Sequence, residues 1–141
     1  MSEISVCTIF CGGVKQPETV VFRMNGMWFD ASRRIIKYEE AEQKLKRESE
    51  VFLKIATDSF GGHGVYYYFM PDGEKDIYRK IDQIKEDIII QRPIRQHPSL
   101  AQLNVSSVNT IRVMSFLAAG EVKILSRIVR VGQAGSRVDN A

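Results

Sequence analysis

The chain has 141 residues, of which 44% are hydrophobic and 26% are charged. This length allows one hydrophobic core, and the composition is that of a folded globular protein, which argues against a disordered chain. The formal net charge is +3, and the 20 basic residues are scattered among 17 acidic ones, so the composition does not indicate a nucleic-acid-binding protein.

Neither a membrane span nor a metal site is indicated. No stretch approaches the roughly 20 apolar residues of a spanning helix, and the first residues lack the pattern of a signal peptide. We therefore expect a cytoplasmic protein. The two cysteines, Cys7 and Cys11, have no second Cys/His pair placed to complete a tetrahedral set, so we interpret them as ordinary thiols and assign no metal ligand.

The first third of the chain predicts a hairpin and a helix. Residues 19–22 and 27–29 are β-prone runs, and the Asn25-Gly26 pair between them is the strongest short turn signal. Residues 35–49 are rich in helix formers, with acidic residues early and basic residues late, which suits the helix dipole. The narrow apolar face of this helix predicts that it covers one side of a sheet.

Residues 51–69 contain two β-prone runs around the glycine-rich loop 58–64, which predicts a second hairpin. The glycines allow backbone amides to approach an anion, and Lys54 supplies a cation, so the segment suggests phosphate binding. Glycine-rich loops and strand-edge lysines also occur in proteins that bind nothing. The spacing matches neither a P-loop nor a Rossmann fingerprint, and both interpretations stay open.

A turn, a helix and a buried strand should follow. Residues 71–73, Pro-Asp-Gly, predict a turn. We expect a helix over about 76–86 from three isoleucines at helical spacing: Ile77, Ile81 and Ile84. Residues 87–91 form a continuous apolar run of the kind buried on both faces of a sheet. The run stops at Arg92-Pro93, where proline ends regular pairing and leaves backbone groups for a flat ligand.

The last third predicts a helical turn over 97–103 and a long hairpin from strands 109–117 and 122–131. Three arginines interrupt these otherwise apolar strands: Arg112, Arg127 and Arg130. Each can point outward to water, which is the usual case, or inward to an anion. His63 and His97 are equally open, since His63 can touch a phosphate or solvent, and His97 can meet a ribose or cap the helical turn.

Four segments in one order carry a resemblance to a known family: 25–30, 51–65, 88–113 and 122–140. Together they resemble the ATP-grasp superfamily, and within it the sugar-transfer-associated ATP-grasp group. This group is related to α-L-glutamate ligases, and its members are sometimes labelled hexapeptide transferase family proteins. The resemblance runs from about Val14 to the last residue.

The resemblance implies roles for individual residues. Lys54 matches the lysine that binds nucleotide phosphate. The loop that folds over the phosphates is matched by Ser59, Gly61, Gly62 and Gly64. The hinge that contacts adenine, largely through its backbone, is matched by Gln91, Arg92, Pro93 and Ile94. Arg112 and Arg130 match arginines that serve the γ-phosphate or an acyl-phosphate intermediate, and Asp139-Asn140 matches the start of a motif near substrate and metal.

Two departures from the family pattern accompany these matches. Arg92 stands where an acidic residue is usual, although a backbone contact to adenine would survive. The residues that hold Mg²⁺ in the full-length family follow the position of Asn140 and are absent here. The resemblance therefore implies ATP as ligand and a carboxylate substrate, in an ATP-binding fragment of a carboxylate–amine ligase-like protein of cell-surface polysaccharide or sugar-transfer metabolism. We expect little or no activity from this chain alone.

The expected fold is α+β. Residues 1–87 should form the small ATP-grasp lobe, an antiparallel sheet with one or two helices on one face, and residues 88–141 the hinge and the first strands of the large lobe. The alternative is a non-catalytic interaction module with a vestigial site, because free strand edges would favour homo-oligomers. Nucleic-acid binding ranks last, although five arginines could serve it: Arg92, Arg95, Arg112, Arg127 and Arg130.

Overall fold

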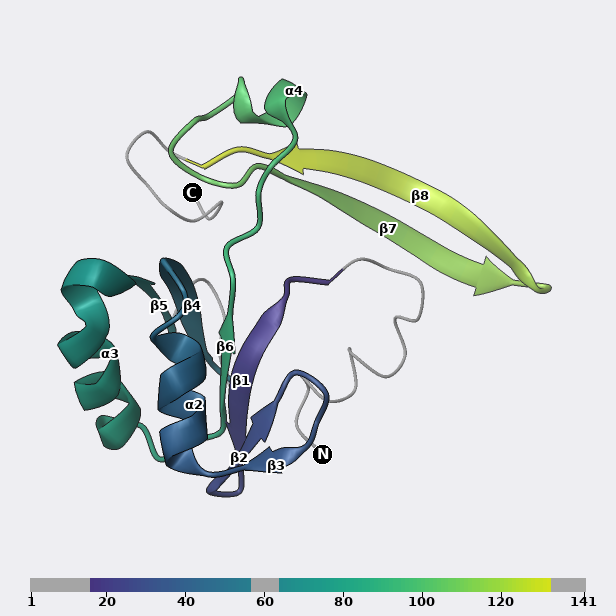
Figure 1. Ribbon diagram of the computed structural model, residues 1–141. Coiled ribbons are helices and arrows are strands. Elements are labelled where there is room, and N and C mark those ends of the chain that lie inside the picture. Colours follow the sequence, from purple (N-terminus) through teal and green to yellow (C-terminus); the bar gives the residue numbers. More distant parts are fainter. Residues whose placement is uncertain (1–15, 57–63, 133–141) are drawn as a thin grey trace. The chain divides into compact units, whose positions relative to one another are not determined.

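The computed structural model describes residues 16–56 and 64–132, which belong to two compact units that divide between Pro93 and Ile94. The first unit is a six-stranded antiparallel sheet with strand order β3-β2-β1-β6-β4-β5. Its strands are β1 (Thr19–Met24), β2 (Met27–Asp30), β3 (Ile35–Ile36), β4 (Glu50–Ile55), β5 (Val65–Phe69) and β6 (Ile88–Gln91). Helices α2 (Tyr38–Leu45) and α3 (Met70–Gln83) lie on one face of this sheet (Figure 1), which confirms the expected α+β class.

Both predicted hairpins of the first unit are present. β1 pairs with β2 through a turn in which Asn25 and Gly26 have φ of 49° and 76°. This left-handed pair is what a two-residue hairpin turn requires, and it explains the choice of Asn-Gly. β4 pairs with β5 in antiparallel register, from Glu50 opposite Phe69 to Lys54 opposite Val65.

β6 lies in the middle of the sheet, between β1 and β4. Ile90 is opposite Val21 of β1 and Leu53 of β4. Ile88, Ile89 and Ile90 are all buried, although successive side chains of a strand point to opposite faces, and this confirms a strand buried on both faces. The compact units divide after Pro93. β6 belongs to the first unit because it bonds to strands of that unit along both of its edges.

Two local predictions are wrong. Ile35–Ile36 is a short strand paired with β2 and not the start of a helix, since β-branched residues suit a pleated edge, and α2 covers only Tyr38–Leu45. Residues 71–73 form the first turn of α3 and not a connecting turn. Proline suits this position because its missing N–H would have no helical partner, and Asp72 favours the positive end of the helix.

The core of the first unit lies between the sheet and the two helices. Its fully buried members come from three strands and both helices: Val21, Leu45, Val51, Leu53, Ile77, Ile81, Ile88 and Ile90. The helices contribute residues at i, i+4 spacing, Ala41 and Leu45 from α2 and Ile77 and Ile81 from α3, so each presents one apolar stripe to the sheet.

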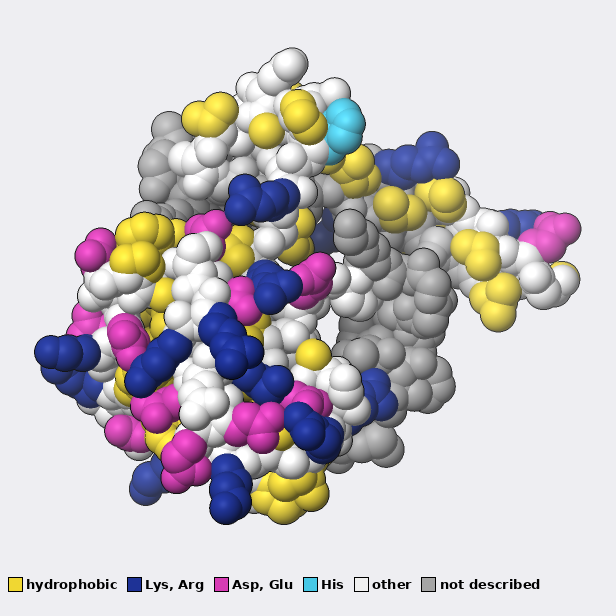
Figure 2. All heavy atoms as spheres, in the orientation of Figure 1, with side chains coloured by type: hydrophobic (Ala, Val, Ile, Leu, Met, Phe, Trp, Pro, Cys, Tyr) yellow, Lys and Arg dark blue, Asp and Glu magenta, His cyan; other side chains and the backbone are white. Residues whose placement is uncertain are grey.

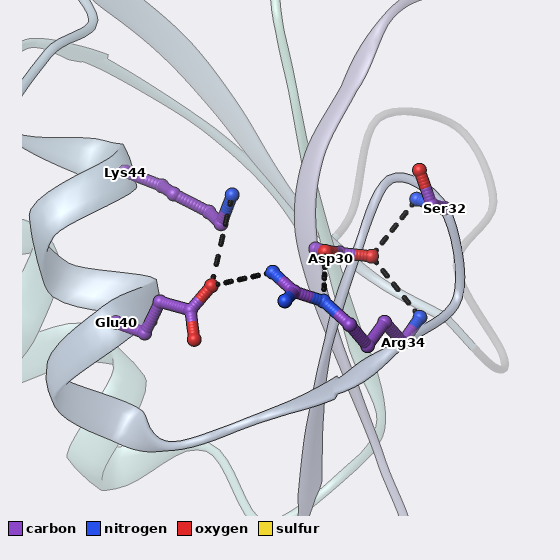
Figure 3. A network of polar contacts seen from close by, with 5 residues as sticks. All are labelled: Asp30, Ser32, Arg34, Glu40 and Lys44. Atoms are coloured by element: carbon purple, nitrogen blue, oxygen red, sulfur yellow. Dashed lines mark hydrogen bonds and ion pairs between the residues drawn. The ribbon is translucent and has the colours of Figure 1, made fainter.

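A polar network closes the β2–β3 turn and ties it to α2 (Figure 3). Asp30 accepts hydrogen bonds from the backbone amides of Ser32 and Arg34, each at 3.0 Å, and pairs with the Arg34 guanidinium at 3.1 Å. Arg34 also pairs with Glu40 of α2 at 2.9 Å. The hydrogen bonds from Arg34 are the main reason that the pKa of Asp30 lies below its usual range.

The second unit contains α4 (Pro98–Ala101) and a long ribbon in which β7 (Thr110–Ala118) pairs with β8 (Glu121–Arg130). This is the predicted hairpin. His97 caps α4, because its Nδ1 accepts a hydrogen bond from the Ser99 amide at 3.2 Å. Of the two roles considered for His97, the structure therefore shows the helix cap.

No helix within 16–56 and 64–132 is both long enough and apolar enough to cross a membrane.

Candidate functional site

Lys54 lies on the face of the sheet opposite the helices. Leu53 points into the core between sheet and helices, and side chains alternate along a strand, so Lys54 projects to the other face. There it is opposite Ile89 of β6 and Val65 of β5. Its Nζ donates a hydrogen bond to Gln91 Oε1 at 3.0 Å.

Gln91 connects three neighbouring strands. Its side-chain oxygen accepts from Lys54 of β4, and its Nε2 donates to Thr19 Oγ1 of β1 at 3.3 Å and to the Pro17 carbonyl at 3.4 Å. The cross-strand register explains this proximity, because Gln91 is opposite Thr19 in β1 and opposite Phe52 in β4. The strand order β1-β6-β4 therefore assembles a polar cluster of Thr19, Lys54 and Gln91 on one face.

The charge of Lys54 has no counter-ion in the part of the chain that the structure describes. Burial lowers the pKa of Lys54, and its hydrogen-bond partner is a neutral amide. Glu50 shares its face of β4 but lies four residues away, roughly 13 Å along an extended strand, and accepts from the Tyr67 hydroxyl at 2.9 Å. Burial removes water that would stabilise the ammonium, and the neutral acceptor does not balance its charge. This arrangement favours binding of an anion, whose negative charge would stabilise the ammonium.

Gly64 is the last residue of the glycine-rich loop and directly precedes β5. Its φ is +75°, and a Cβ added there would approach the Ile55 Cβ at 3.2 Å. The Gly64 carbonyl accepts from the Ile55 amide at 2.8 Å, which continues the β4–β5 pairing next to Lys54. Glycine is therefore required here for backbone geometry. The remaining loop candidates lie outside the described residues: Ser59, Gly61, Gly62 and His63.

Arg92 is held in a carboxylate clamp. Its Nε and Nη2 donate to the two Glu48 oxygens at 2.7 and 2.8 Å, and its Nη1 pairs with Glu18. These hydrogen bonds, first to Glu48 and then to Glu18, raise the pKa of Arg92. Its backbone amide donates to the Glu18 carbonyl at 2.8 Å. The Arg92 side chain and amide thus anchor the end of β6, where Pro93 closes the first unit.

The second unit places Arg112 and Arg130 on one face of the ribbon. Arg112 is opposite Ile128, and Arg130 is opposite Thr110, so the two arginines are diagonal neighbours. Arg127 is opposite Val113 and projects from the other face. Ile94, the first residue of this unit, is exposed.

Local sequence patterns gave no indication of several residues that shape these sites. Thr19 and Glu18 are 72 and 74 positions from their partners Gln91 and Arg92, and Glu48 is 44 positions from Arg92. Only the pairing of β1 and β4 with β6 makes them neighbours. Within the described ranges, no group of three or more His, Cys, Asp or Glu residues could hold a metal ion, and Cys7, Cys11, Asp139 and Asn140 lie outside them.

Comparison with known proteins gives one match. The model of the family described as sugar-transfer associated ATP-grasp matches residues 13–141. The match spans every helix and strand within the described residues. Neither the curated proteins nor the solved structures gave a match.

Proposed function

Because the chain belongs to the sugar-transfer associated ATP-grasp family, we propose that it binds ATP and that Lys54 holds a phosphate group. The observation that carries this proposal is the partly buried Lys54 ammonium, whose described partner is the neutral Gln91 amide. Several surface cations of the first unit, in contrast, pair with carboxylates, as Arg34 does with Asp30 and Arg92 with Glu48. A phosphate would supply the negative charge that Lys54 lacks.

The resemblance to the family supports roles for the other candidate residues in binding a nucleotide. The loop residues Ser59, Gly61, Gly62 and Gly64 would cover the phosphates, and the backbone of Gln91, Arg92, Pro93 and Ile94 would border the adenine. Arg112 and Arg130, which share one face of the ribbon, would meet the γ-phosphate. ATP-grasp proteins generally bind Mg²⁺ with ATP, but the described residues offer no set of ligands that fits it, so no residue is assigned to the metal.

The reaction that we propose for the complete site of the family is phosphoryl transfer to a carboxylate. A carboxylate oxygen of the substrate attacks the γ-phosphorus, ADP leaves, and an amine then displaces phosphate from the acyl phosphate. Positive charge from Arg112 and Arg130 would stabilise the negative charge that develops on the transferred group. We propose that this chemistry takes place in the cytoplasm and serves cell-surface polysaccharide or sugar-transfer metabolism. We also propose a relation to α-L-glutamate ligases and to the proteins labelled as hexapeptide transferases.

The proposal predicts that the Lys54→Met variant binds ATP at least about tenfold more weakly than the native chain, or about 1.4 kcal/mol. Removing the ammonium takes away the charge that attracts the phosphate. Calorimetric titration with a non-hydrolysable ATP analogue measures the loss, and Lys75→Met, at an exposed position of α3, is the matched control. Equal affinity of Lys54→Met and native chain would contradict the role of Lys54, and a folded native chain that binds no analogue would overturn ATP binding.

The two faces of the ribbon provide a second prediction. We expect Arg112→Gln to weaken binding of the ATP analogue several-fold and to leave ADP binding unchanged, because Arg112 is assigned to the γ-phosphate. Arg127→Gln removes the same charge from the opposite face and should change neither affinity. Parallel titrations of both variants with both nucleotides measure this difference. An equal effect of the two substitutions would show that only net charge matters.

One observation favours the alternative of a non-catalytic interaction module. Apolar side chains are exposed along the whole ribbon, as Figure 2 shows for one side: Ile111, Val113, Met114, Phe116, Leu117, Val122, Ile124, Leu125, Ile128 and Val129. Exposed apolar patches of this kind commonly mark protein interfaces. A folded chain that fails to bind nucleotide and sediments as a homo-oligomer would favour this alternative over ATP binding.

A further inference from the structure

The Gln91 amide is oriented by the groups on both of its sides. Its NH₂ faces two acceptors, Thr19 Oγ1 and the Pro17 carbonyl, and its oxygen faces the Lys54 ammonium. Turning the amide over would place its NH₂ against an ammonium and its oxygen against a carbonyl, which is unfavourable at both ends. The chemistry of the partners therefore leaves one orientation, with the oxygen toward Lys54.

This orientation has two consequences for Lys54. A lysine side chain loses rotamer entropy when a ligand fixes it, and an acceptor that already holds the amine in place removes part of that cost before the ligand arrives. One hydrogen bond to Gln91 uses one of the three N–H donors of the ammonium and leaves two for an anion. The acceptor is neutral, so it holds the charge of Lys54 in place without cancelling it.

We infer that Gln91 is a positioning residue that fixes the Lys54 amine for an incoming phosphate, through a relay from Thr19 to Gln91 to Lys54. The inference rests on the proposed function for the identity of the ligand. It assigns the side chain of Gln91 a role that is separate from any backbone contact of this segment with adenine. A carboxylate at position 91 would have nearly the same shape but would form an ion pair with Lys54 and compete with the phosphate.

The test compares three variants of the full chain. We expect Gln91→Glu to weaken binding of a non-hydrolysable ATP analogue at least about tenfold and Gln91→Leu to weaken it several-fold. Thr19→Val, which keeps the shape of the side chain but removes the hydroxyl, should have a smaller effect in the same direction. Gln43→Glu, the same amide-to-acid change at an exposed position of α2, is the control and should leave affinity unchanged.

A second readout does not depend on ATP. The pH dependence of Lys54 acylation, followed by mass spectrometry of the labelled chain, reports its titration directly. Gln91→Glu should shift the titration of Lys54 to higher pH because a carboxylate stabilises the ammonium, and Gln43→Glu should not. Gln91→Leu should increase the rate of acylation, since the amine is no longer held.

The two readouts separate the inference from the proposed function. If the native chain binds no analogue but the acylation results follow this pattern, ATP binding fails and the positioning of Lys54 by Gln91 stands. If Gln91→Glu binds the analogue as tightly as the native chain and leaves the titration of Lys54 unchanged, the positioning role is overturned. Circular dichroism shows whether each variant is folded. If Gln91→Glu or Gln91→Leu fails to fold, the conservative Thr19→Val substitution still tests the relay.

Discussion

We expect the Leu53→Ala variant to lose about 2–5 kcal/mol of the free energy of unfolding of the first unit. Leu53 has no exposed surface and lies in β4, with Ile90 of β6 on one side and Tyr66 of β5 on the other. Truncation removes buried methyl and methylene groups and leaves a cavity between the sheet and the helices. The neighbours of Leu53 belong to three paired strands, so they cannot collapse far into the space.

Urea unfolding followed by the fluorescence of Trp28 measures this loss. Trp28 is the single tryptophan of the chain and is buried in the first unit, so the signal reports that unit. The control is Ile35→Ala in β3, where the side chain is 65% exposed and the expected loss is below about 1 kcal/mol. A loss for Leu53→Ala no larger than that of the control would contradict the position of Leu53 in the core.

The second large effect is expected from Asn109→Asp in the second unit, which should lose roughly 3 kcal/mol or more at neutral pH. Asn109 is buried, and its Nδ2 donates to Gln96 Oε1, the Leu100 carbonyl and the Asn104 carbonyl at 3.0, 2.8 and 3.1 Å. A carboxylate there would direct negative charge at three acceptor oxygens. These contacts join α4 and the loop after it to the start of β7, so the whole connection should loosen.

Amide hydrogen exchange of residues 96–110 measures the effect, because the tryptophan signal belongs to the other unit. The surrounding acceptor oxygens would raise the pKa of the aspartate at this position. The loss of stability should therefore grow as the pH rises above about 4, the usual pKa of an aspartate, and shrink as the pH falls toward that value. Gln102→Glu, an amide-to-acid change at an exposed position, should stay within about 0.5 kcal/mol. Equal protection in Asn109→Asp and Gln102→Glu would contradict this account.

Most local structure follows from residue types and their order. Asn25-Gly26 accepts left-handed φ values and therefore specifies the β1–β2 turn, and the isoleucines of residues 88–90 specify a strand buried on both sides. The errors occurred where two preferences compete. Ile35 and Ile36 adjoin strong helix formers but pair with β2, and Pro71 suits both a turn and the first turn of a helix. In each case the neighbouring strand or core decided the outcome.

The sequence by itself determined most strand segments, the class of fold, the position of Lys54 in a β-strand and the resemblance that pointed to a nucleotide. Only the tertiary structure decided which side chains meet. β6 could have paired at an edge of the sheet, but it lies between β1 and β4, and this places Gln91 between Thr19 and Lys54. The physical reason is that a local pattern encodes which face of a strand is apolar, whereas the order of strands depends on how the whole sheet buries its most apolar member at the centre.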